Sequence, residues 1–282
     1  MAHRGLQARM VLAGGVVFGF YVLVAALFAP VVGLPVVLAG SVLFAGVQYV
    51  VGKKLALRSV GAEDLPEGEY PEVHRRVEAL GEAAGIEKPR LVVGRMGAPK
   101  AFAVGRRGAG VVALSESMLR MVEEGHMSMD ELEGILAHEL AHIENRDVVV
   151  MVMGQAIASI VGLTVFFVVE AVADEVPLVG FLVSYALSVV SQLLVMVFVL
   201  AVSRYREYVA DADAASYTGE PAALASGLAK VVEVGRREEA PDPDENVAAL
   251  CFFGGKRGLL ARLFATHPPA EARIERLEEM AA

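Results

Sequence analysis

The sequence predicts a polytopic membrane protein whose fold is mainly α with a small β-sheet, and it predicts four transmembrane helices. Hydrophobic residues make up 55% of the 282 residues, and the mean hydropathy of +0.53 is high for a soluble domain. The excess comes from four apolar segments, roughly 10–29, 31–51, 148–169 and 177–202. None of them contains Asp, Glu, Lys or Arg, and each is close to the ~20 apolar residues that cross a bilayer.

The four segments are expected to form two helical hairpins. Pro30, Gly33 and Pro35 mark a tight turn between the first two segments. Arg4 and Arg9 precede the first segment as in a secretory signal, but the apolar run is too long for a signal and leads into a second one. We therefore expect this hairpin to be retained. Buried helices of a soluble protein are the alternative, and uncharged runs of this length argue against it.

Positive charges beside the segments predict their orientation. Lys and Arg precede the first and third segments and follow the second and fourth, and neither short turn contains one. These cations are Arg4, Arg9, Lys53, Lys54, Arg58, Arg146, Arg204 and Arg206. The positive-inside rule therefore predicts a multi-pass protein of the cell (plasma) membrane with both termini and the hydrophilic parts in the cytoplasm.

Cysteine content and net charge restrict the cell compartments and the classes of partner that suit the protein. The single cysteine, Cys251, permits no internal disulfide, which is compatible with a reducing compartment. The net charge of −9 makes nucleic acid an unsuitable partner. The sequence carries no signal for an oligomeric state.

The apolar segments divide the chain into four parts. Residues 1–52 are the first transmembrane hairpin, residues 53–147 a hydrophilic part, residues 148–202 the second hairpin, and residues 203–282 a second hydrophilic part. Any domain outside the membrane must therefore be assembled from two pieces of chain that a hairpin separates in the sequence.

Local patterns predict the elements of the first hydrophilic part. Residues 71–84 have the apolar spacing of an amphipathic helix. Residues 90–93, 101–104 and 111–114 have the composition of short strands. The glycine-rich segment 105–110 is expected to be a hairpin turn, because it opens no helix as a phosphate loop would.

Two histidines, His138 and His142, lie four residues apart in a segment with a marked helix start. Ser128 and Glu131 have the spacing of a capping box. Residues four apart share a face of a helix, so both imidazoles can bind one metal ion. Glu139 is then placed to take a proton from a metal-bound water. This helix can continue without a break into the third apolar segment.

A catalytic zinc site needs three protein ligands and an open position for water. Two Glu-x-x-x-Asp patterns, Glu170 with Asp174 and Glu207 with Asp211, offer a third ligand. Glu170 lies 28 residues beyond His142, which is ~42 Å along a helix and across the membrane. Glu207 follows the fourth segment, on the same side as His142, and is the predicted ligand. Asp211 is expected to accept the other ring N–H of a ligand histidine.

Taken together, three motifs make the chain resemble the HtpX-like membrane zinc metalloproteases, which share peptidase family M48 with the CAAX prenyl protease Ste24. The motifs are His138-Glu-Leu-Ala-His142 with Asn145 and Asp147, then Ser203-Arg-Tyr-Arg-Glu207-Tyr-Val-Ala-Asp211, then Thr266-His267-Pro268-Pro269 with Arg273. The resemblance covers essentially the whole chain. It implies a gluzincin-type zinc metallopeptidase domain at the cytoplasmic membrane surface, with one Zn²⁺ per chain, often active in membrane protein quality control.

The resemblance also implies a role for each motif residue. His138, His142 and Glu207 are implied as zinc ligands, and Glu139 as the general base. His267 is implied as the stabiliser of the oxyanion, with a capping or surface histidine ahead of a proline-led helix as its alternative.

Three further motif residues have two interpretations each. Arg273 either orients a nearby carboxylate or covers the surface of its helix. Asn145 and Asp147 match the family pattern, and capping of a helix end explains them nearly as well.

One segment departs from the family pattern. Family members usually have Asn-Ala-Phe-Ala where this chain has Lys100-Ala101-Phe102-Ala103. That strand is expected to pair with a peptide substrate by edge addition. Lys100 is charged and only donates hydrogen bonds, so the substrate strand Ala101, Phe102 and Ala103 carries over and the contact of the Asn does not.

The predicted function is hydrolysis of peptide bonds in misfolded or membrane proteins at the cytoplasmic membrane surface, by a zinc-activated water with Glu139 as general base. The expected partners are protein or peptide substrates and the lipid bilayer. Two alternatives stay open, a narrow processing protease of the CAAX type and a non-enzymatic, zinc-stabilised membrane scaffold. A transporter is disfavoured because no charged residue lies inside an apolar segment.

Overall fold

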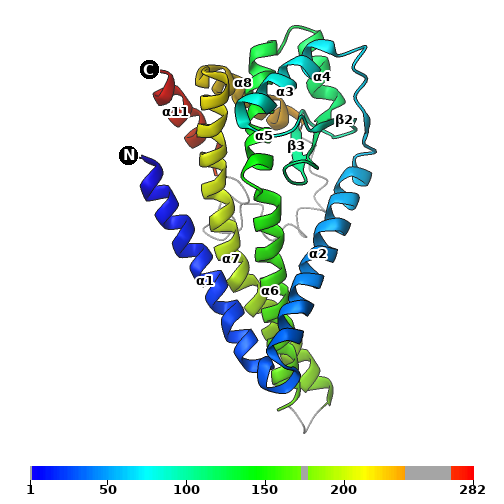
Figure 1. Ribbon diagram of the computed structural model, residues 1–282, viewed down its shortest axis with the longest axis vertical. Helices are drawn as coiled ribbons and strands as arrows, with labels where there is room; N and C mark the ends of the chain where they lie inside the picture. Colours follow the sequence, from blue (N-terminus) through cyan, green and yellow to red (C-terminus); the bar gives the residue numbers. More distant parts are fainter. Residues whose placement is uncertain (1, 173–176, 239–267) are drawn as a thin grey trace. The chain divides into compact units, whose positions relative to one another are not determined.

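The structure is a computed structural model that describes residues 2–172, 177–238 and 268–282 (Figure 1). Its elements are, in chain order, α1 (Ala2–Val32), α2 (Leu34–Ser59), β1 (Glu63–Asp64), α3 (Pro71–Ala84), β2 (Arg90–Gly94), β3 (Ala101–Val104), β4 (Val111–Ser115), α4 (Glu116–Glu123), α5 (Met129–Glu144), α6 (Asp147–Glu170), α7 (Pro177–Thr218), α8 (Pro221–Glu238) and α11 (Ala270–Ala281). The mainly helical fold with a small sheet is therefore confirmed.

The described residues form two compact units. The first unit contains the chain up to Val51 and Val150–Tyr205, and the second contains Gly52–Val149 together with residues 206–238 and 268–282. The second unit is thus built from stretches of chain that lie on either side of Val150–Tyr205 in the sequence.

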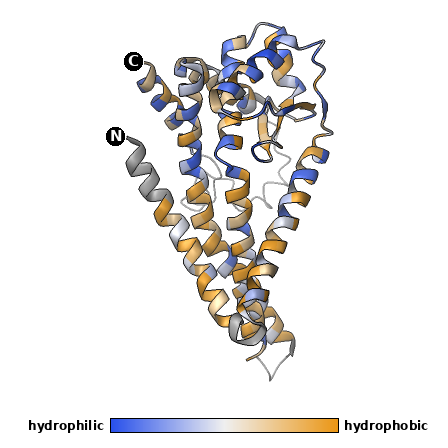
Figure 2. Cartoon of the chain, viewed as in Figure 1, coloured by the Kyte–Doolittle hydropathy of each residue, from blue (hydrophilic) through white to orange (hydrophobic). Residues whose placement is uncertain are grey.

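Apolar helices make up the first unit, as their colouring in Figure 2 shows. Three helices are long and apolar enough to cross a membrane, namely Leu34–Ser59, Asp147–Glu170 and Leu178–Thr218. In α1 the described apolar stretch Val11–Leu27 is shorter. Three of the four predicted segments are therefore candidate spans, and a span in α1 stays a prediction.

Small residues allow α6 and α7 to approach closely within the first unit. A Cβ atom added to Gly154 would lie 3.0 Å from the side chain of Val199, and one added to Gly162 would lie 3.1 Å from the carbonyl oxygen of Ser188. Ala158, midway between the two glycines, is fully buried. Small residues spaced by four on one face are a common way for membrane helices to pack.

A four-stranded sheet with the order β1-β2-β4-β3 lies in the second unit. β2 runs parallel to its neighbour β4, whereas β3 pairs antiparallel with β4 and is joined to it by residues 105–110. The hairpin turn predicted from the glycines is therefore confirmed. β4 is buried along its whole length, and β3 forms one edge of the sheet.

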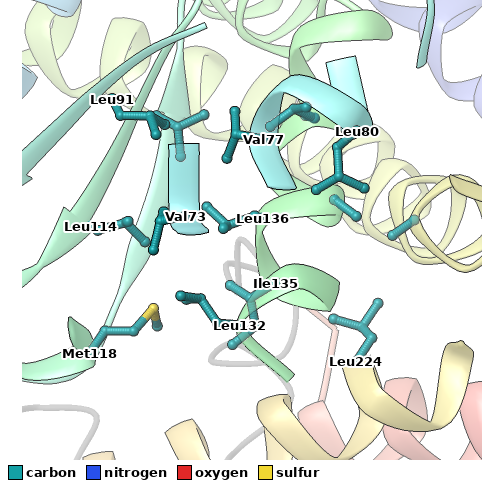
Figure 3. Packing of buried hydrophobic residues seen from close by; sticks show 14 of the residues in the cluster. Val73, Val77, Leu80, Leu91, Leu114, Met118, Leu132, Ile135, Leu136 and Leu224 are labelled. Carbon is teal, nitrogen blue, oxygen red and sulfur yellow. The ribbon is translucent and has the colours of Figure 1, made fainter. Parts of the chain in front are cut away.

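Helix α5 packs on this sheet and on α3 through one apolar face. Leu132 and Leu136 are fully buried, and Figure 3 shows them beside Val73 and Val77 of α3 and Leu114 of β4. The amphipathic helix predicted at residues 71–84 has these bounds in the structure. The apolar contacts hold α5 in place, so that its His138 side chain takes a fixed position in the second unit.

The start of α5 is fixed by the predicted capping box. The Glu131 N–H donates to Ser128 Oγ at 3.1 Å, and the Ser128 N–H donates to Glu131 Oε2 at 2.7 Å. Glu131 also accepts hydrogen bonds from Ser226 Oγ and Lys230 Nζ of α8, at 2.5 and 2.7 Å. One carboxylate therefore caps α5 and ties it to α8.

The end of α5 differs from the prediction. The helix ends at Glu144 and α6 begins at Asp147, so the expectation of one continuous helix is wrong. Arg146 has a φ of 58°, which is a left-handed conformation that a right-handed helix does not contain. The helical run is therefore interrupted between Glu144 and Asp147.

Candidate metal centre

Two histidines of α5 and one glutamate of α7 converge in the second unit. His138 Nε2 lies 3.1 Å from His142 Nε2. Glu207 Oε2 and Oε1 lie 3.5 and 3.6 Å from the Nε2 atoms of His138 and His142, respectively. A tetrahedral metal with bonds of 2.0–2.2 Å holds its ligand atoms about 3.3–3.6 Å apart. The three side chains therefore have the spacing of a metal site, which His138, His142 and Glu207 could hold together.

Asp147 orients the second histidine. Its Oδ2 atom lies 2.6 Å from His142 Nδ1. An ionised carboxylate only accepts hydrogen bonds, so Nδ1–H donates and Nε2 keeps its lone pair for a metal. Asp147 in turn pairs with Arg206, whose guanidinium also donates to the Asn145 carbonyl at 2.7 Å. Asp147, which follows the break after α5, contacts His142, so the role of this aspartate extends beyond capping a helix.

Asp211 and Arg273 repeat this arrangement at the first histidine. Asp211 Oδ1 lies 3.0 Å from His138 Nδ1. Arg273 donates to both Asp211 oxygens, at 2.8 and 2.6 Å, and lies 3.0 Å from Glu207 Oε2. Arg273 is only 7% exposed. Of its two interpretations, the structure thus supports an arginine that orients carboxylates, and a residue that covers the helix surface is ruled out.

The charges of this buried group leave room for a divalent cation. Its four buried carboxylates face two arginines, which leaves two negative charges when both histidines are neutral. The six residues are Glu139, Asp147, Glu207 and Asp211 with Arg206 and Arg273. Buried charges are costly unless opposite charges offset them. A doubly charged metal at the three ligand atoms supplies that offset, so the donor set and the charge both fit.

The pKa values of the two histidines shift in opposite directions when no metal is bound. Burial and the charge of Arg273 lower the pKa of His138, but hydrogen bonds to Asp211 and Glu207 outweigh both and raise it to about 9. Burial and the adjacent His138 lower the pKa of His142 to about 4. The metal-free pair therefore carries one positive charge at neutral pH, and a bound cation would take the place of the extra proton on His138.

The other predicted site residues fall into three groups. Glu139 is buried on α5, directly after His138. Ala101, Phe102 and Ala103 form β3 at the edge of the sheet. His267 lies outside the described residues.

The alternative ligand and the unusual lysine also have defined places. Glu170 Oε2 accepts a hydrogen bond from Ser184 Oγ at 3.0 Å, and its partner Asp174 lies outside the described residues. The Lys100 N–H donates to Ser115 Oγ at 3.0 Å, and the Lys100 carbonyl accepts from the Ser115 N–H at 2.9 Å. The backbone of Lys100 thus holds the start of β3 against Ser115, and these hydrogen bonds do not involve the lysine side chain.

Two residues of this network were missed by reasoning from the sequence. Arg206 counted only as a charge beside a membrane segment, although it directly precedes Glu207. Asp213 accepts a hydrogen bond from Asn145 Nδ2 at 2.7 Å, which joins the end of α5 to α7. The only available signal was their position within two residues of the Glu207 and Asp211 motif.

Comparison with known proteins assigns the family. The model of Peptidase family M48 matches residues 67–281, which include all of these site residues. The chain belongs to peptidase family M48. The resemblance expected from its motifs is confirmed, and this M48 peptidase is a protease with apolar helices typical of a membrane protein. Membership of a metalloprotease family also implies a metal, typically zinc.

Relatives of this M48 peptidase match it over most of their length. A Protease HtpX homolog of Halobacterium salinarum is 44% identical and aligns over 95% of this chain and 99% of its own. One of Kineococcus radiotolerans is 36% identical, over 99% and 97%. One of Pyrococcus abyssi is 35% identical, over 83% and 82%. The M48 peptidase is therefore similar to these proteins along both of its units.

Proposed function

We propose that this M48 peptidase is a zinc endopeptidase that cleaves misfolded or membrane proteins at the cytoplasmic surface of the cell membrane. The observation that carries the proposal is the convergence of His138, His142 and Glu207 with spacings of 3.1–3.6 Å, inside a buried group that a divalent cation would neutralise. Two imidazoles and one carboxylate are a common ligand set of catalytic zinc. When bound, zinc supplies a Lewis acid for the scissile carbonyl and lowers the pKa of water.

Glu139 is the proposed general base. It follows His138 on α5 and is 8% exposed, so its carboxylate is shielded from solvent, and it is close enough for its charge to act on His142 and Arg273. In hydrolysis it accepts the proton of the attacking water and passes it to the leaving amine. His267 is the proposed donor to the oxyanion, on the strength of its motif.

The edge of β3 is the proposed binding site for the substrate backbone. β3 pairs with β4 on one side, with Ala101 opposite Leu114 and Ala103 opposite Val112. Within the described residues no strand pairs with its other side. An extended peptide can add there by backbone hydrogen bonds. β3 also contacts α5, which supports an edge close to Glu139.

The cytoplasmic location is supported by the placement of cations. The residues that follow α2's apolar run include Lys53 and Lys54, and Arg204 and Arg206 follow that of α7. Such residues are enriched on the cytoplasmic side of membrane segments. Placement on that side would give the site access to proteins that emerge from or enter the membrane.

The substitution Glu139→Gln tests the mechanism. Purified full-length protein should keep one zinc per chain, by metal analysis, and lose at least about 10²-fold of its cleavage of an unfolded protein, because only the base is removed. Glu144→Gln removes a carboxylate from the same helix and should cleave normally. Undiminished cleavage by Glu139→Gln would refute the assignment.

Substrate choice separates the remaining alternatives. A panel of unfolded membrane proteins and a prenylated peptide should be offered to the wild type and to Glu139→Gln. We expect several of the unfolded proteins to be cut. Cleavage of the prenylated peptide alone would identify a narrow processing protease, and bound metal without any cleavage would identify a scaffold.

A further inference from the structure

Cations gather at one end of the sheet, although the chain as a whole carries a net charge of −9. Helix α2 continues from its apolar residues directly into Lys53 and Lys54. Lys53 Nζ donates a hydrogen bond to the carbonyl of Ala109 at 2.8 Å. The turn between β3 and β4 therefore lies against the polar end of α2, within the second unit.

Two arginines from other segments lie at the same end of the sheet. Arg106 lies in the turn, where its carbonyl accepts from the Ala109 N–H at 2.9 Å. Arg90 begins β2 and is paired with Val111 at the start of β4, and its N–H donates to the Gly110 carbonyl at 3.1 Å. Both arginines are exposed. Three stretches of chain thus present positive side chains at one place.

Carboxylates neutralise only part of this group. Asp64 pairs with Arg90, Glu144 pairs with the neighbouring Arg107, and Glu87 reaches the turn near Gly108. Among the residues that the structure describes, no acidic side chain pairs with Lys53, Lys54 or Arg106. Positive charges therefore outnumber negative charges on this surface, and no acidic side chain among the described residues pairs with the excess cations.

We propose that Lys53, Lys54 and Arg106, together with Arg90, form a surface that binds the phosphate groups of anionic phospholipids. The site on α2 begins two residues after Val51, the last of its apolar run, which is where a spanning helix leaves the hydrocarbon and meets headgroups. Anionic headgroups complement the excess charge, and each basic residue near such a surface strengthens the attraction.

Lipid binding here bears on the peptidase, because the turn that carries Arg106 directly follows β3. A headgroup held by the turn would fasten the edge that is proposed to receive substrate, and that consequence rests on the proposed function. The lipid contact itself needs no catalysis. Its failure is therefore distinguishable from a failure of the Glu139→Gln test.

The chain contains no tryptophan, so Ala109→Trp introduces a single fluorophore into the turn. The full-length protein, with Glu139→Gln to prevent self-cleavage, is reconstituted into phosphatidylcholine bilayers that contain phosphatidylglycerol. Two preparations are compared. In one the phosphatidylglycerol carries bromine, which quenches tryptophan fluorescence on contact, and in the other an equal amount of the phosphatidylcholine carries it. We expect stronger quenching by the brominated anionic lipid, and we expect added salt to weaken that preference.

Charge substitutions test which residues produce the preference. Lys53→Gln with Arg106→Gln should reduce it by about fivefold for each charge removed. Arg95→Gln with Arg120→Gln removes two exposed cations from other parts of the same unit and should leave it unchanged. Lys54→Gln, at an exposed position, gives a smaller loss without disturbing the Lys53 hydrogen bond and serves if the double variant misfolds.

Three results would overturn the proposal. Equal quenching by the two brominated lipids would show that the turn does not select anionic headgroups. Equal losses in the Arg95 and Arg120 control would show a general charge effect. Displacement by inorganic phosphate beyond that by chloride at the same ionic strength would show a site for free phosphate in place of a lipid surface.

Discussion

At the residue scale, each histidine of the candidate centre is held by an aspartate, and each aspartate by an arginine. Asp147 and Arg206 hold His142, whereas Asp211 and Arg273 hold His138. The aspartates fix which ring nitrogen carries the proton, and the arginines hold the aspartates in position.

Replacement of either aspartate should weaken metal binding. Asp147→Asn replaces a carboxylate that only accepts with an amide that can accept or donate, so the tautomer of His142 is no longer fixed. We expect zinc affinity to fall about 10–100-fold. Competition with a chelating dye measures the affinity. Asp213→Asn, which changes a carboxylate that accepts its hydrogen bond from Asn145, is the matched control. If Asp147→Asn bound zinc as tightly as the control, the carboxylate would be a helix cap and nothing more.

The sequence was sufficient to predict Glu207 but left the role of Asp147 undecided. Glu207 was selected because helix length excluded Glu170, a comparison that needs only residue counts. Asp147 reaches His142 because Arg146 adopts a left-handed conformation, which no local pattern indicates. Arg273 is 135 residues from His138, so only the folded chain reveals their contact.

At the element scale, α5 and α8 approach each other closely at Gly134. A Cβ atom added to Gly134 would lie 2.9 Å from both Cα and N of Leu224. Since both are backbone atoms, Gly134→Ala must push the helices apart, and we expect a loss of about 1–3 kcal/mol in the free energy of unfolding. Gly235→Ala in α8 meets no atom within 4 Å and should stabilise by about 0.5–1 kcal/mol. Urea unfolding measures both, and equal effects would contradict the packing argument.

The carboxylate that links α5 to α8 predicts a dependence on pH. Burial would raise the pKa of Glu131, but hydrogen bonds from Lys230, Ser226 and Ser128 outweigh burial and lower it. A lowered pKa in the folded state stabilises the protein above the ordinary pKa of the carboxyl group, and this stability is lost as the pH falls through the lowered value.

Glu131→Gln should therefore flatten the acid side of the stability profile. We expect it to lower the urea midpoint at neutral pH and to reduce the decline in the midpoint as the pH falls below the ordinary pKa of a glutamate. Glu82→Gln removes an exposed carboxylate of α3 as the control. A decline in Glu131→Gln as steep as that of the wild type would place the responsible groups elsewhere.

The elements themselves were largely predictable, and their pairing was not. The capping box marked the start of α5, and residues with a high propensity for β-strands marked the strands to within one residue. The sheet order was beyond local reasoning, because the parallel pairing of β2 with β4 inserts β4 between β2 and β3. Such pairing depends on contacts between residues distant in the sequence.

At the scale of the whole molecule, the metal is expected to act on one unit only. Its three ligands come from α5 and the end of α7, which both belong to the second unit. A ligand that binds only the folded state stabilises it by about 4 kcal/mol at a thousand times its Kd. Removal of zinc with a chelator should therefore abolish cleavage and speed hydrogen exchange in α5 and α3.

The first unit serves as the internal control in that experiment. Exchange in α6 between Gly154 and Gly162, where small residues pack against α7, should be unchanged by the chelator. Equal acceleration in both units would mean that the two unfold together, and no acceleration in either would mean that no structural metal had been removed.

The order of synthesis gives the position of Arg273 a further meaning. A ribosome makes His138 and Asp211 well before α11, because Arg273 follows His138 by 135 residues. Until α11 emerges, the carboxylates of Asp211 and Glu207 lack the guanidinium that pairs with both. The centre therefore has its full set of contacts only after α11 has been made, so its three candidate metal ligands are synthesised before the arginine that holds the carboxylates in place.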